Sequence, residues 1–323
     1  MDLLTFSPTV AAAVRASGLD VVVTGGSGWL GRATLEMLES CFGTEAPARI
    51  HAFASSSRSL TLRSGTSIEV SPLEDLPRLR IGPHLVAHYA FATRELVARM
   101  DTRTYVALNQ RITELIEDHL RRQRPAGMVT ISSGAVYLGD DLEANPYGVL
   151  KARDEIRFQG IAEQLGDSGP IPRLVIPRLF NLAGPFLNKT DHYLLGSIIE
   201  DIARGGPIRI HADRQVVRSY MHVVDLVDLA FAVMVDDGPV PAAAFDTAGE
   251  RDVEAGELAG LAASVLGRTG MPIERPPLGG GRPDRYVGDP RVLEALRESY
   301  GIGRRDLAVQ IADTARYLIP AMP

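Results

Sequence analysis

The chain has 323 residues, of which 23% are charged and 45% are hydrophobic, and its formal net charge is −6. A chain of this length buries an ample core in one large domain or two closely joined domains, which excludes intrinsic disorder. The acidic balance excludes the usual duplex nucleic-acid binder, and no window reaches the ~18 apolar residues of a membrane span.

The single cysteine, Cys41, can form neither an internal disulfide nor a metal site with several cysteine ligands. The first residues lack the positive charge of a secretory signal, since Asp2 stands before two leucines. We therefore expect a cytoplasmic protein with no membrane or nucleic-acid partner. His84 and His88 are four residues apart, but no cysteine or carboxylate joins them nearby, so we expect no metal site.

The first half of the chain alternates short apolar strands with segments of helical period. Ser7 and Pro8 indicate the cap and first turn of a helix. Buried strands are predicted at residues 20–24, 49–54, 67–70, 84–90, 128–132 and 173–177, and helices at 30–41, 104–123 and 147–165. This alternation predicts a Rossmann-type, doubly wound parallel sheet of the α/β class.

Beyond Asn181 the pattern loosens into a region punctuated by Gly and Pro. Helices are predicted here at residues 194–204, 223–235, 257–266, 290–300 and 305–318. We predict a dinucleotide-binding domain at 1–181, its sheet completed by about 216–250, and a smaller C-terminal substrate-binding lobe at 182–215 and 251–323.

A glycine-rich segment, TGGSGWLG at Thr24 to Gly31, directly follows the first strand and opens a helix. In this context one glycine permits the tight turn, the next lets backbone approach a pyrophosphate, and the third lets helix and strand pack closely. The helix N-terminus adds donors for phosphate oxygens. The predicted cofactor contacts are Gly25, Ser27, Gly28, Trp29, Leu30 and Gly31. A glycine-rich turn without a ligand is the alternative.

The end of the second strand indicates which dinucleotide binds. Chains that prefer NAD place an Asp or Glu there, but no carboxylate occurs from Ala46 to Ile68. The strand runs instead into Ser55, Ser56, Ser57 and Arg58, and these groups suit a 2′-phosphate, assisted by Arg32. We predict NADP as the cofactor, with NAD as the alternative if Arg58 is an ordinary solvated residue.

Tyr147 and Lys151 stand four residues apart at the start of a predicted helix, so both side chains project from one face. A tyrosine exchanges protons at neutral pH only when a nearby cation stabilises its phenolate, and Lys151 can supply that cation. Ser133 follows the strand 128–132, where doubly wound folds place their ligand crevice, and its hydroxyl can bind a substrate oxygen. Ser132 is its rival for this role.

The chain resembles the extended short-chain dehydrogenase/reductase superfamily, specifically its nucleotide-sugar epimerase, ketoreductase and dehydratase branch. The resemblance covers nearly the whole chain. It rests on TGGSGWLG at Thr24 to Gly31, SSGAVY at Ser132 to Tyr137, YGVLK at Tyr147 to Lys151, RLFNLAGP at Arg178 to Pro185, RSYMHVVDL at Arg218 to Leu226 and GRPDRYVGDP at Gly281 to Pro290.

The resemblance implies roles for particular residues. Tyr147 is the implied general acid/base, Lys151 the residue that lowers its pKa and holds the nicotinamide ribose, and Ser133 the ligand of the substrate oxygen. Asn109 is implied to position Lys151 through water. Ala90 completes the expected cofactor contacts.

For the substrate, the resemblance places Asn181, Arg218 and Arg282 against the diphosphate of a nucleotide sugar, which guanidinium groups suit well. His192 is a further candidate for the sugar pocket. The alternative for the two arginines is a structural ion pair with Asp225 or Asp284.

Residues that differ from those of family members at matching positions exclude some of the family's reactions. Sugar 4,6-dehydratases carry an Asp-Glu pair where this chain has Gly134 and Ala135, which have no proton to give, so we do not expect dehydration. Cys41 lies too far away in the chain to replace the cysteine of the related epimerase-reductases. We expect a 4-ketoreductase that uses NADPH, with a 4-epimerase that retains NAD as the alternative. Reduction of a non-sugar ketone or aldehyde, or a non-catalytic NADP sensor, also remains open.

The predicted helix 104–123 carries a one-sided apolar stripe. Together with the helix at 147–165, it resembles the pair that forms a four-helix dimer interface in this superfamily. We therefore expect a homodimer, the alternative being that the stripe only covers the sheet.

Overall fold

The computed structural model describes residues 4–167, 169, 172–236, 238 and 244–319. The chain divides into two compact units. The larger unit contains the chain up to Arg178 together with Val227–Phe245, and the smaller unit contains Leu179–Leu226 and the chain from Asp246 onward. Each unit has its own sheet and hydrophobic core.

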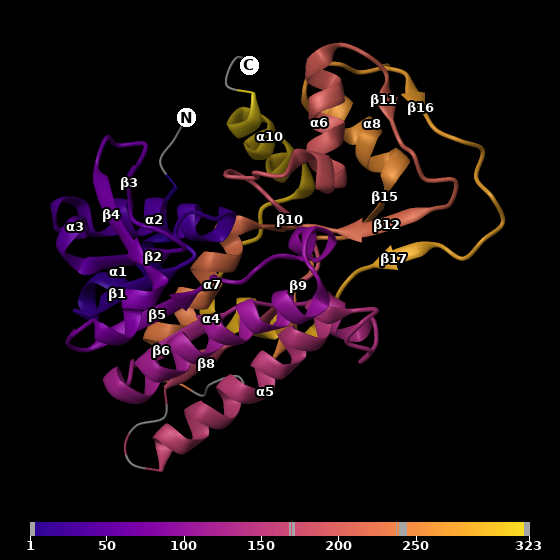
Figure 1. The fold of residues 1–323 in the computed structure, drawn as a ribbon. Helices are drawn as coiled ribbons and strands as arrows, with labels where there is room; N and C mark the ends of the chain where they lie inside the picture. Colours follow the sequence, from indigo (N-terminus) through magenta and orange to yellow (C-terminus); the bar gives the residue numbers. More distant parts are fainter. Residues whose placement is uncertain (1–3, 168, 170–171, 237, 239–243, 320–323) are drawn as a thin grey trace. The chain divides into compact units, whose positions relative to one another are not determined.

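The larger unit is built on a seven-stranded sheet with the order β3-β4-β2-β1-β5-β6-β8. Strand β3 is antiparallel to β4, and the other pairings in this order are parallel. Figure 1 shows these strands as indigo to magenta arrows. The predicted Rossmann-type α/β fold is confirmed. The strands are β1 (Asp20–Thr24), β2 (Ile50–Ala54), β3 (Arg58–Thr61), β4 (Ser67–Pro72), β5 (His84–His88), β6 (Gly127–Thr130) and β8 (Arg173–Val175).

Helices join the parallel strands, because such strands need crossover connections. They are α2 (Trp29–Phe42), the short α3 (Ala46–Arg49), α4 (Thr102–Gln123) and α5 (Pro146–Gly166), whereas α1 (Pro8–Ala16) precedes β1. One core cluster lies between the sheet and two helices. The strands contribute Val22, Val86 and Met128, α4 contributes Ile116, and α5 contributes Phe158. Residues alternate between the two faces of a strand, so Val21 and Val23 face the opposite side of the sheet, and both are fully buried.

Two predicted strands are divided between two sheets. The strand predicted at 128–132 becomes β6 of the seven-stranded sheet and β7 (Ser132–Ser133), which lies in a three-stranded sheet with β9 (Pro177–Leu179) and β14 (Phe245–Asp246). The Ile131 carbonyl between β6 and β7 accepts a hydrogen bond from Lys151. The strand predicted at 173–177 becomes β8 and β9, and the Ile176 carbonyl between them accepts from the Phe245 amide.

Short 3₁₀ turns complete the larger unit: η1 (Gly43–Glu45), η2 (Leu73–Arg78), η3 (Arg94–Arg99) and η4 (Gly134–Tyr137). Ser7 precedes α1 as predicted, with Pro8 at the first helical position, but its side chain makes no capping hydrogen bond. Instead, the Ser7 amide donates to the Asp228 carboxylate at 2.9 Å.

The smaller unit packs three helices around an apolar core of Leu, Ile and Ala side chains. These are α6 (Leu194–Arg204), α8 (Ala255–Val265) and α10 (Leu307–Leu318), and α9 (Arg291–Tyr300) lies between the last two in the chain. Strands β15 (Asp252–Glu254), β12 (Val216–Ser219) and β17 (Asp284–Tyr286) form one small sheet.

Two strand pairs and three further elements complete the inventory. Strand β10 (Leu182–Ala183) pairs with β13 (Met221–His222), and β11 (Ile208–Arg209) pairs with β16 (Ile273–Glu274). Beyond these lie η5 (Thr190–His192), α7 (Val223–Val235) and β14 (Phe245–Asp246). Within the described residues, no helix is long and apolar enough to cross a bilayer.

Three histidines are buried in the larger unit and hydrogen-bonded to neutral partners. His84 and His119 share a hydrogen bond of 3.0 Å between their Nε2 atoms, and His88 Nδ1 lies 2.7 Å from the Thr24 hydroxyl. Burial lowers the pKa of all three, that of His119 to about 4 and that of His88 to about 3. The folded protein therefore holds them neutral.

This predicts acid destabilisation at unusually mild pH. The stability from each neutral histidine is complete above the unfolded pKa of about 6.5 and is lost as pH falls toward the lowered folded pKa. Between pH 7.5 and pH 5, His119 and His88 should each remove about 2 kcal/mol from the free energy of unfolding, measured with urea. His119→Gln should therefore reduce the pH dependence of the free energy of unfolding relative to the wild type. Equal pH dependence in the variant and the wild type would contradict this account.

Candidate active site

The glycine loop lies at the carboxyl end of β1, against the end of β5. Gly25 adopts a positive φ of 71°, and a Cβ there would come within 2.8 Å of the Ala90 backbone nitrogen. A Cβ on Gly31 would come within 2.2 Å of the Gly25 carbonyl oxygen. The Ala90 amide in turn donates to the Thr24 hydroxyl at 3.3 Å. Glycine is therefore required at both positions for this approach.

The start of α2 is open to a ligand. Gly28 is its N-cap, in extended conformation, and offers no side chain to the first amides of the helix. Ser27, Trp29 and Leu30 are all partly exposed around it. A helix N-terminus of this kind suits phosphate oxygens, so the residues present fit a dinucleotide pyrophosphate.

The cluster at the end of β2 is exposed but differs from the predicted loop. Ser55 and Ser56 follow β2, whereas Arg58 begins β3 and donates to the Ser56 hydroxyl at 2.8 Å. Arg32 donates to the Thr61 carbonyl at the other end of β3, at 3.1 Å. The sequence did not predict β3, because the four residues RSLT carry a weak strand signal.

Tyr147 and Lys151 lie in the first turns of α5, and both contact Phe91, which follows β5. The Lys151 ammonium lies 3.7 Å from the centroid of the Phe91 ring, and the Tyr147 ring meets the same ring edge to face at 5.6 Å. Lys151 also donates to the Ile131 carbonyl at 2.6 Å. The structure thus brings the predicted tyrosine and lysine together around an aromatic ring that sequence reasoning missed.

Lys151 is only 7% exposed. Burial lowers its pKa to about 8, because a charged ammonium loses its hydration there. The carbonyl of Ile131 and the face of Phe91 compensate part of this loss. Lys151 therefore loses its proton at a lower pH than an exposed lysine does.

Ser133 is brought close to the start of α5 by a contact between backbones. It caps the turn η4, and its hydroxyl accepts from the Ala135 amide at 3.2 Å. Gly148, next to Tyr147, lies so near this turn that a Cβ would fall 2.2 Å from the Ala135 oxygen. Asn145 caps α5 by accepting from the Gly148 amide at 3.1 Å and donates to the Ala135 carbonyl at 2.9 Å. Asn145 and Gly148 thus fix η4 against the helix that carries Tyr147.

Ser132, the rival of Ser133, has a different partner. Its hydroxyl donates to the Glu155 carboxylate, which also accepts from the Arg178 guanidinium at 2.8 and 2.6 Å. Arg178 further donates to the Tyr137 hydroxyl at 2.7 Å. This network occupies Ser132, so the geometry favours Ser133 as the serine for a substrate.

Asn109 is fully buried in α4 and is bonded to the loop that follows β5. Its Oδ1 accepts from the Ala92 amide at 2.8 Å, and its Nδ2 donates to the Tyr105 carbonyl at 3.2 Å. The Tyr105 hydroxyl holds the Ala92 carbonyl at 2.7 Å. Asn109 therefore orders the segment that carries Phe91, through side-chain hydrogen bonds to Ala92 and Tyr105.

The residues predicted to bind the diphosphate and the sugar, other than Ser133, lie in the smaller unit. Arg218 pairs with Asp284 at 3.0 Å, the ion pair considered as its alternative role. Asn181 donates to the carbonyls of Ser219 and Tyr286, both at 3.3 Å, so it and Arg218 meet at the β12–β17 pair. Arg282 is exposed just before β17. His192 lies in η5, half-exposed, 3.7 Å from Asp191.

The alternative ion pair with Asp225 is not formed. The Asp225 carboxylate accepts from the Arg305 amide at 2.9 Å and pairs with the guanidinium of the same residue. Asp225 therefore stabilises the segment before α10.

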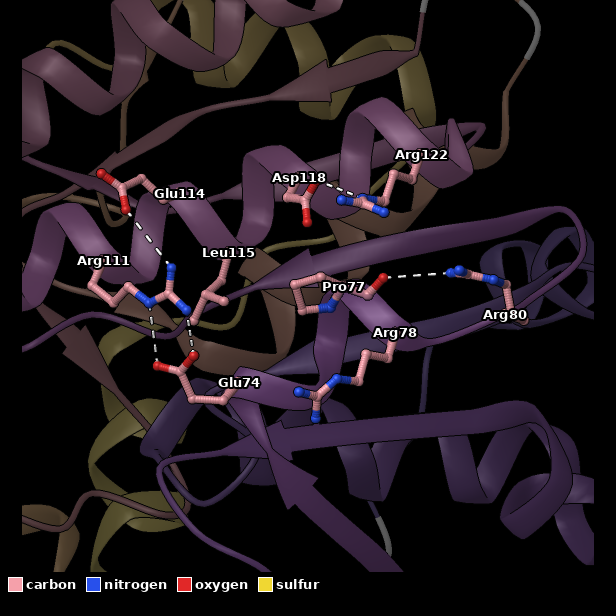
Figure 2. Close-up of a pocket in the computed structure, with 9 residues that line it drawn as sticks. All are labelled: Glu74, Pro77, Arg78, Arg80, Arg111, Glu114, Leu115, Asp118 and Arg122. Carbon is pink, nitrogen blue, oxygen red and sulfur yellow. Dashed lines mark hydrogen bonds and ion pairs between the residues drawn. The ribbon is translucent and has the colours of Figure 1, made fainter.

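A surface cavity of about 500 Å³ lies between η2 and α4 and contains none of the predicted site residues. Arginines line it, with carboxylates beside them (Figure 2). Arg111 lies 2.6 Å from Glu74 and 3.9 Å from Glu114, and Arg122 lies 2.6 Å from Asp118. These acids balance most of the positive charge, which disfavours anion binding. In the described part of the chain, no three His, Cys, Asp or Glu residues gather as metal ligands do.

The fold and the glycine loop define the class: a Rossmann-type protein of the extended short-chain dehydrogenase/reductase kind. The model of the NAD dependent epimerase/dehydratase family matches residues 21–243. The chain belongs to this family. No curated protein sequence matches it.

Solved structures support the same fold at low sequence identity. UDP-N-acetylglucosamine 4-epimerase from Methanobrevibacter ruminantium is 19% identical with a TM-score of 0.73, and the match covers 94% of this chain and 99% of that one. UDP-glucose 4-epimerase from Thermotoga maritima is 18% identical with a TM-score of 0.68, covering 93% and 98%. The dTDP-glucose 4,6-dehydratase DesIV from Streptomyces venezuelae, solved with NAD and TYD bound, is 18% identical with a TM-score of 0.70, covering 94% and 98%.

Two glycines of α5 provide a matched test of the contact between η4 and this helix. Gly148→Ala should lower the free energy of unfolding by about 1–3 kcal/mol, because the new methyl group would overlap the Ala135 carbonyl. Gly160→Ala, where no atom lies within 4 Å, should instead raise it by about 0.5–1 kcal/mol. Urea denaturation measures both changes. Equal effects of the two substitutions would show that the close approach is unimportant.

Proposed function

We propose that the protein is a 4-ketoreductase that transfers hydride to a keto carbon of a nucleotide-activated sugar, with NADPH as cofactor and Tyr147 as general acid. The observation that carries this proposal is that Tyr147 and Lys151 both contact the Phe91 ring. Phe91 follows β5 directly after Ala90, whose backbone lies against Gly25 of the glycine loop. Family membership supports the wider class of NAD-dependent enzymes acting on nucleotide sugars.

The chemistry divides between cofactor and chain. When bound, the nicotinamide supplies the hydride. Tyr147 donates its hydroxyl proton to the carbonyl oxygen, so the ketone gains one hydride and one proton and becomes an alcohol. The Lys151 ammonium stabilises the phenolate that Tyr147 then carries, until solvent returns a proton. Ser133 donates a hydrogen bond to the same substrate oxygen.

Two features support NADPH-dependent reduction within this family. Ser55, Ser56 and Arg58 lie exposed where a carboxylate would otherwise favour NAD, and guanidinium and hydroxyl groups suit a 2′-phosphate. Gly134 and Ala135 are buried in η4 and offer no acid for dehydration.

A 4-epimerase with retained NAD is the second candidate. It needs the same tyrosine, lysine and serine, and the neighbours include UDP-N-acetylglucosamine and UDP-glucose 4-epimerases. The two candidates differ in whether the cofactor leaves after each turnover.

For the substrate, we propose that Arg218, Arg282 and Asn181 bind the diphosphate of the nucleotide. Arg218 bonds to Asp284 through both terminal guanidinium nitrogens, so a diphosphate bound here would share Arg218 with this carboxylate or displace it. Exposed Arg282 adds a further positive charge two residues before Asp284. We propose that His192 contacts the sugar of the nucleotide sugar.

We also propose a cytoplasmic homodimer formed through α4 and α5. These helices pack on each other, and Leu108 and Ile156 on them are 41% and 73% exposed. Covering such side chains favours association. Ile156→Glu should shift the sedimentation mass from dimer to monomer, and a monomeric wild-type protein would contradict the proposal.

The nucleotide retained by the protein distinguishes the two candidates. Protein purified without added nucleotide, then denatured, should release little nicotinamide nucleotide, and the empty site should bind NADPH more tightly than NADH. Arg58→Ala should weaken NADPH binding about tenfold, through loss of a charge-assisted hydrogen bond of about 1.5 kcal/mol, and leave NADH binding unchanged. Stoichiometric release of NAD would instead establish the epimerase.

Tyr147→Phe tests the catalytic assignment. The substitution removes only the hydroxyl and keeps the ring against Phe91, so folding and cofactor affinity should be nearly unchanged. Turnover of a 4-keto nucleotide sugar should fall by about 10²–10⁴-fold, because proton transfer is lost. Tyr137→Phe, which removes a phenol bound to Arg178, is the matched control and should retain turnover. Unchanged turnover in Tyr147→Phe would refute the assignment.

A further inference from the structure

Two carboxylates follow Lys151 on α5, and the structure uses them differently. Asp154 and Glu155 stand three and four residues after Lys151, so they share its side of the helix. Glu155 is paired with Arg178, with which it makes hydrogen bonds of 2.8 and 2.6 Å. Its negative charge is therefore largely compensated by a guanidinium.

Asp154 is held by a neutral group. The Thr113 hydroxyl of α4 lies 2.9 Å from its Oδ1 atom. The nearby guanidinium of Arg157 is bonded to Glu117, with its Nε 2.8 Å from the carboxylate. Burial raises the pKa of the Asp154 carboxyl, whereas Lys151, the Thr113 hydroxyl and Arg157 lower it. The charge of the ionised Asp154 carboxylate raises the Lys151 pKa against the effect of burial, more than that of Glu155 does.

The other titratable groups near Lys151 supply no comparable anion. His88 on β5 is neutral, because burial and Lys151 itself lower its pKa to about 3. On α4, burial raises the pKa of Tyr105, so that phenol is neutral as well. The charge of Glu95, in η3, raises the pKa of Tyr105 further. The Tyr147 ring lies against Phe91. Among these described groups, Asp154 is the anion best placed to balance Lys151.

We propose that Asp154 is a positioning residue that keeps the Lys151 ammonium charged inside the buried site. Its contribution to turnover rests on the function proposed above, since a charged Lys151 is what Tyr147 needs to release its proton. Thr113 fixes the Asp154 carboxylate from the neighbouring helix. Asp154 therefore sets the upper pH limit of the active enzyme without touching the substrate.

The composition of the chain allows a direct test. Lys151 and Lys189 are its two lysines, so a full-length protein labelled with ¹³C at lysine Cε gives two side-chain signals, and Lys189→Arg assigns them. Following the Lys151 signal against pH should give a midpoint of about 8. In the isosteric variant Asp154→Asn, this midpoint should fall by about one pH unit.

Glu163→Gln is the matched control, because it removes an exposed carboxylate further along the same helix and should leave the midpoint unchanged. An unchanged midpoint in Asp154→Asn would overturn the proposal. If that variant does not fold, Thr113→Val, which releases the carboxylate, should move the midpoint in the same direction, and no movement would overturn the proposal equally.

Turnover separates this proposal from the function it rests on. A lowered Lys151 midpoint together with a pH profile whose alkaline limb moves down would support both. A lowered midpoint in a protein that turns over no 4-keto nucleotide sugar would support the role of Asp154 and refute the proposed function.

Discussion

A lysine ammonium buried with little access to water is the constraint on which the arrangement of the larger unit's site depends. A desolvated charge is tolerated only when polar or aromatic groups replace its hydration. The Ile131 carbonyl, which lies between β6 and β7, accepts its hydrogen bond. Phe91 presents its ring face, and Asn109 and Tyr105 hold the loop that carries it. A strand end, a loop and a helix thus each contribute to the surroundings of one charge.

The site also depends on two places where the backbone of a helix lies in close contact with the backbone of a preceding turn. At Gly31 and Gly148, the first turn of a helix approaches another carbonyl more closely than a Cβ allows. Both helices start at the carboxyl ends of parallel strands, the place where doubly wound sheets bind ligands. The two glycines therefore bring the glycine loop and the start of α5, which carries Tyr147 and Lys151, to the same edge of the sheet.

The sequence was informative where local pattern decides structure. The bounds of β1, α6 and α7 agree with the prediction, because each is a compact or periodic apolar run flanked by clear breaks. The spacing of Tyr147 and Lys151 could likewise be read, since four residues in a helix determine a shared face. Long-range pairs were less accessible. The ion pair of Arg218 with Asp284 was predicted only as an alternative, beside Asp225, which does not form it. The contact of Arg178 with Glu155 joins distant parts of the chain, and the ring of Phe91 has no spacing signal relative to α5, so neither was predicted.

The bare start of α2 has a consequence for the lifetime of the protein. Gly28 offers the first amides of the helix no side-chain cap, whereas a serine or asparagine there would bind them itself. An anion bound there would bind the native state and not the unfolded chain, so occupancy and conformational stability become linked. Molecules carrying a nucleotide would then resist local opening and proteolysis longer than empty ones. The cellular abundance of the protein would follow its nucleotide supply, so the loop would act as a form of quality control.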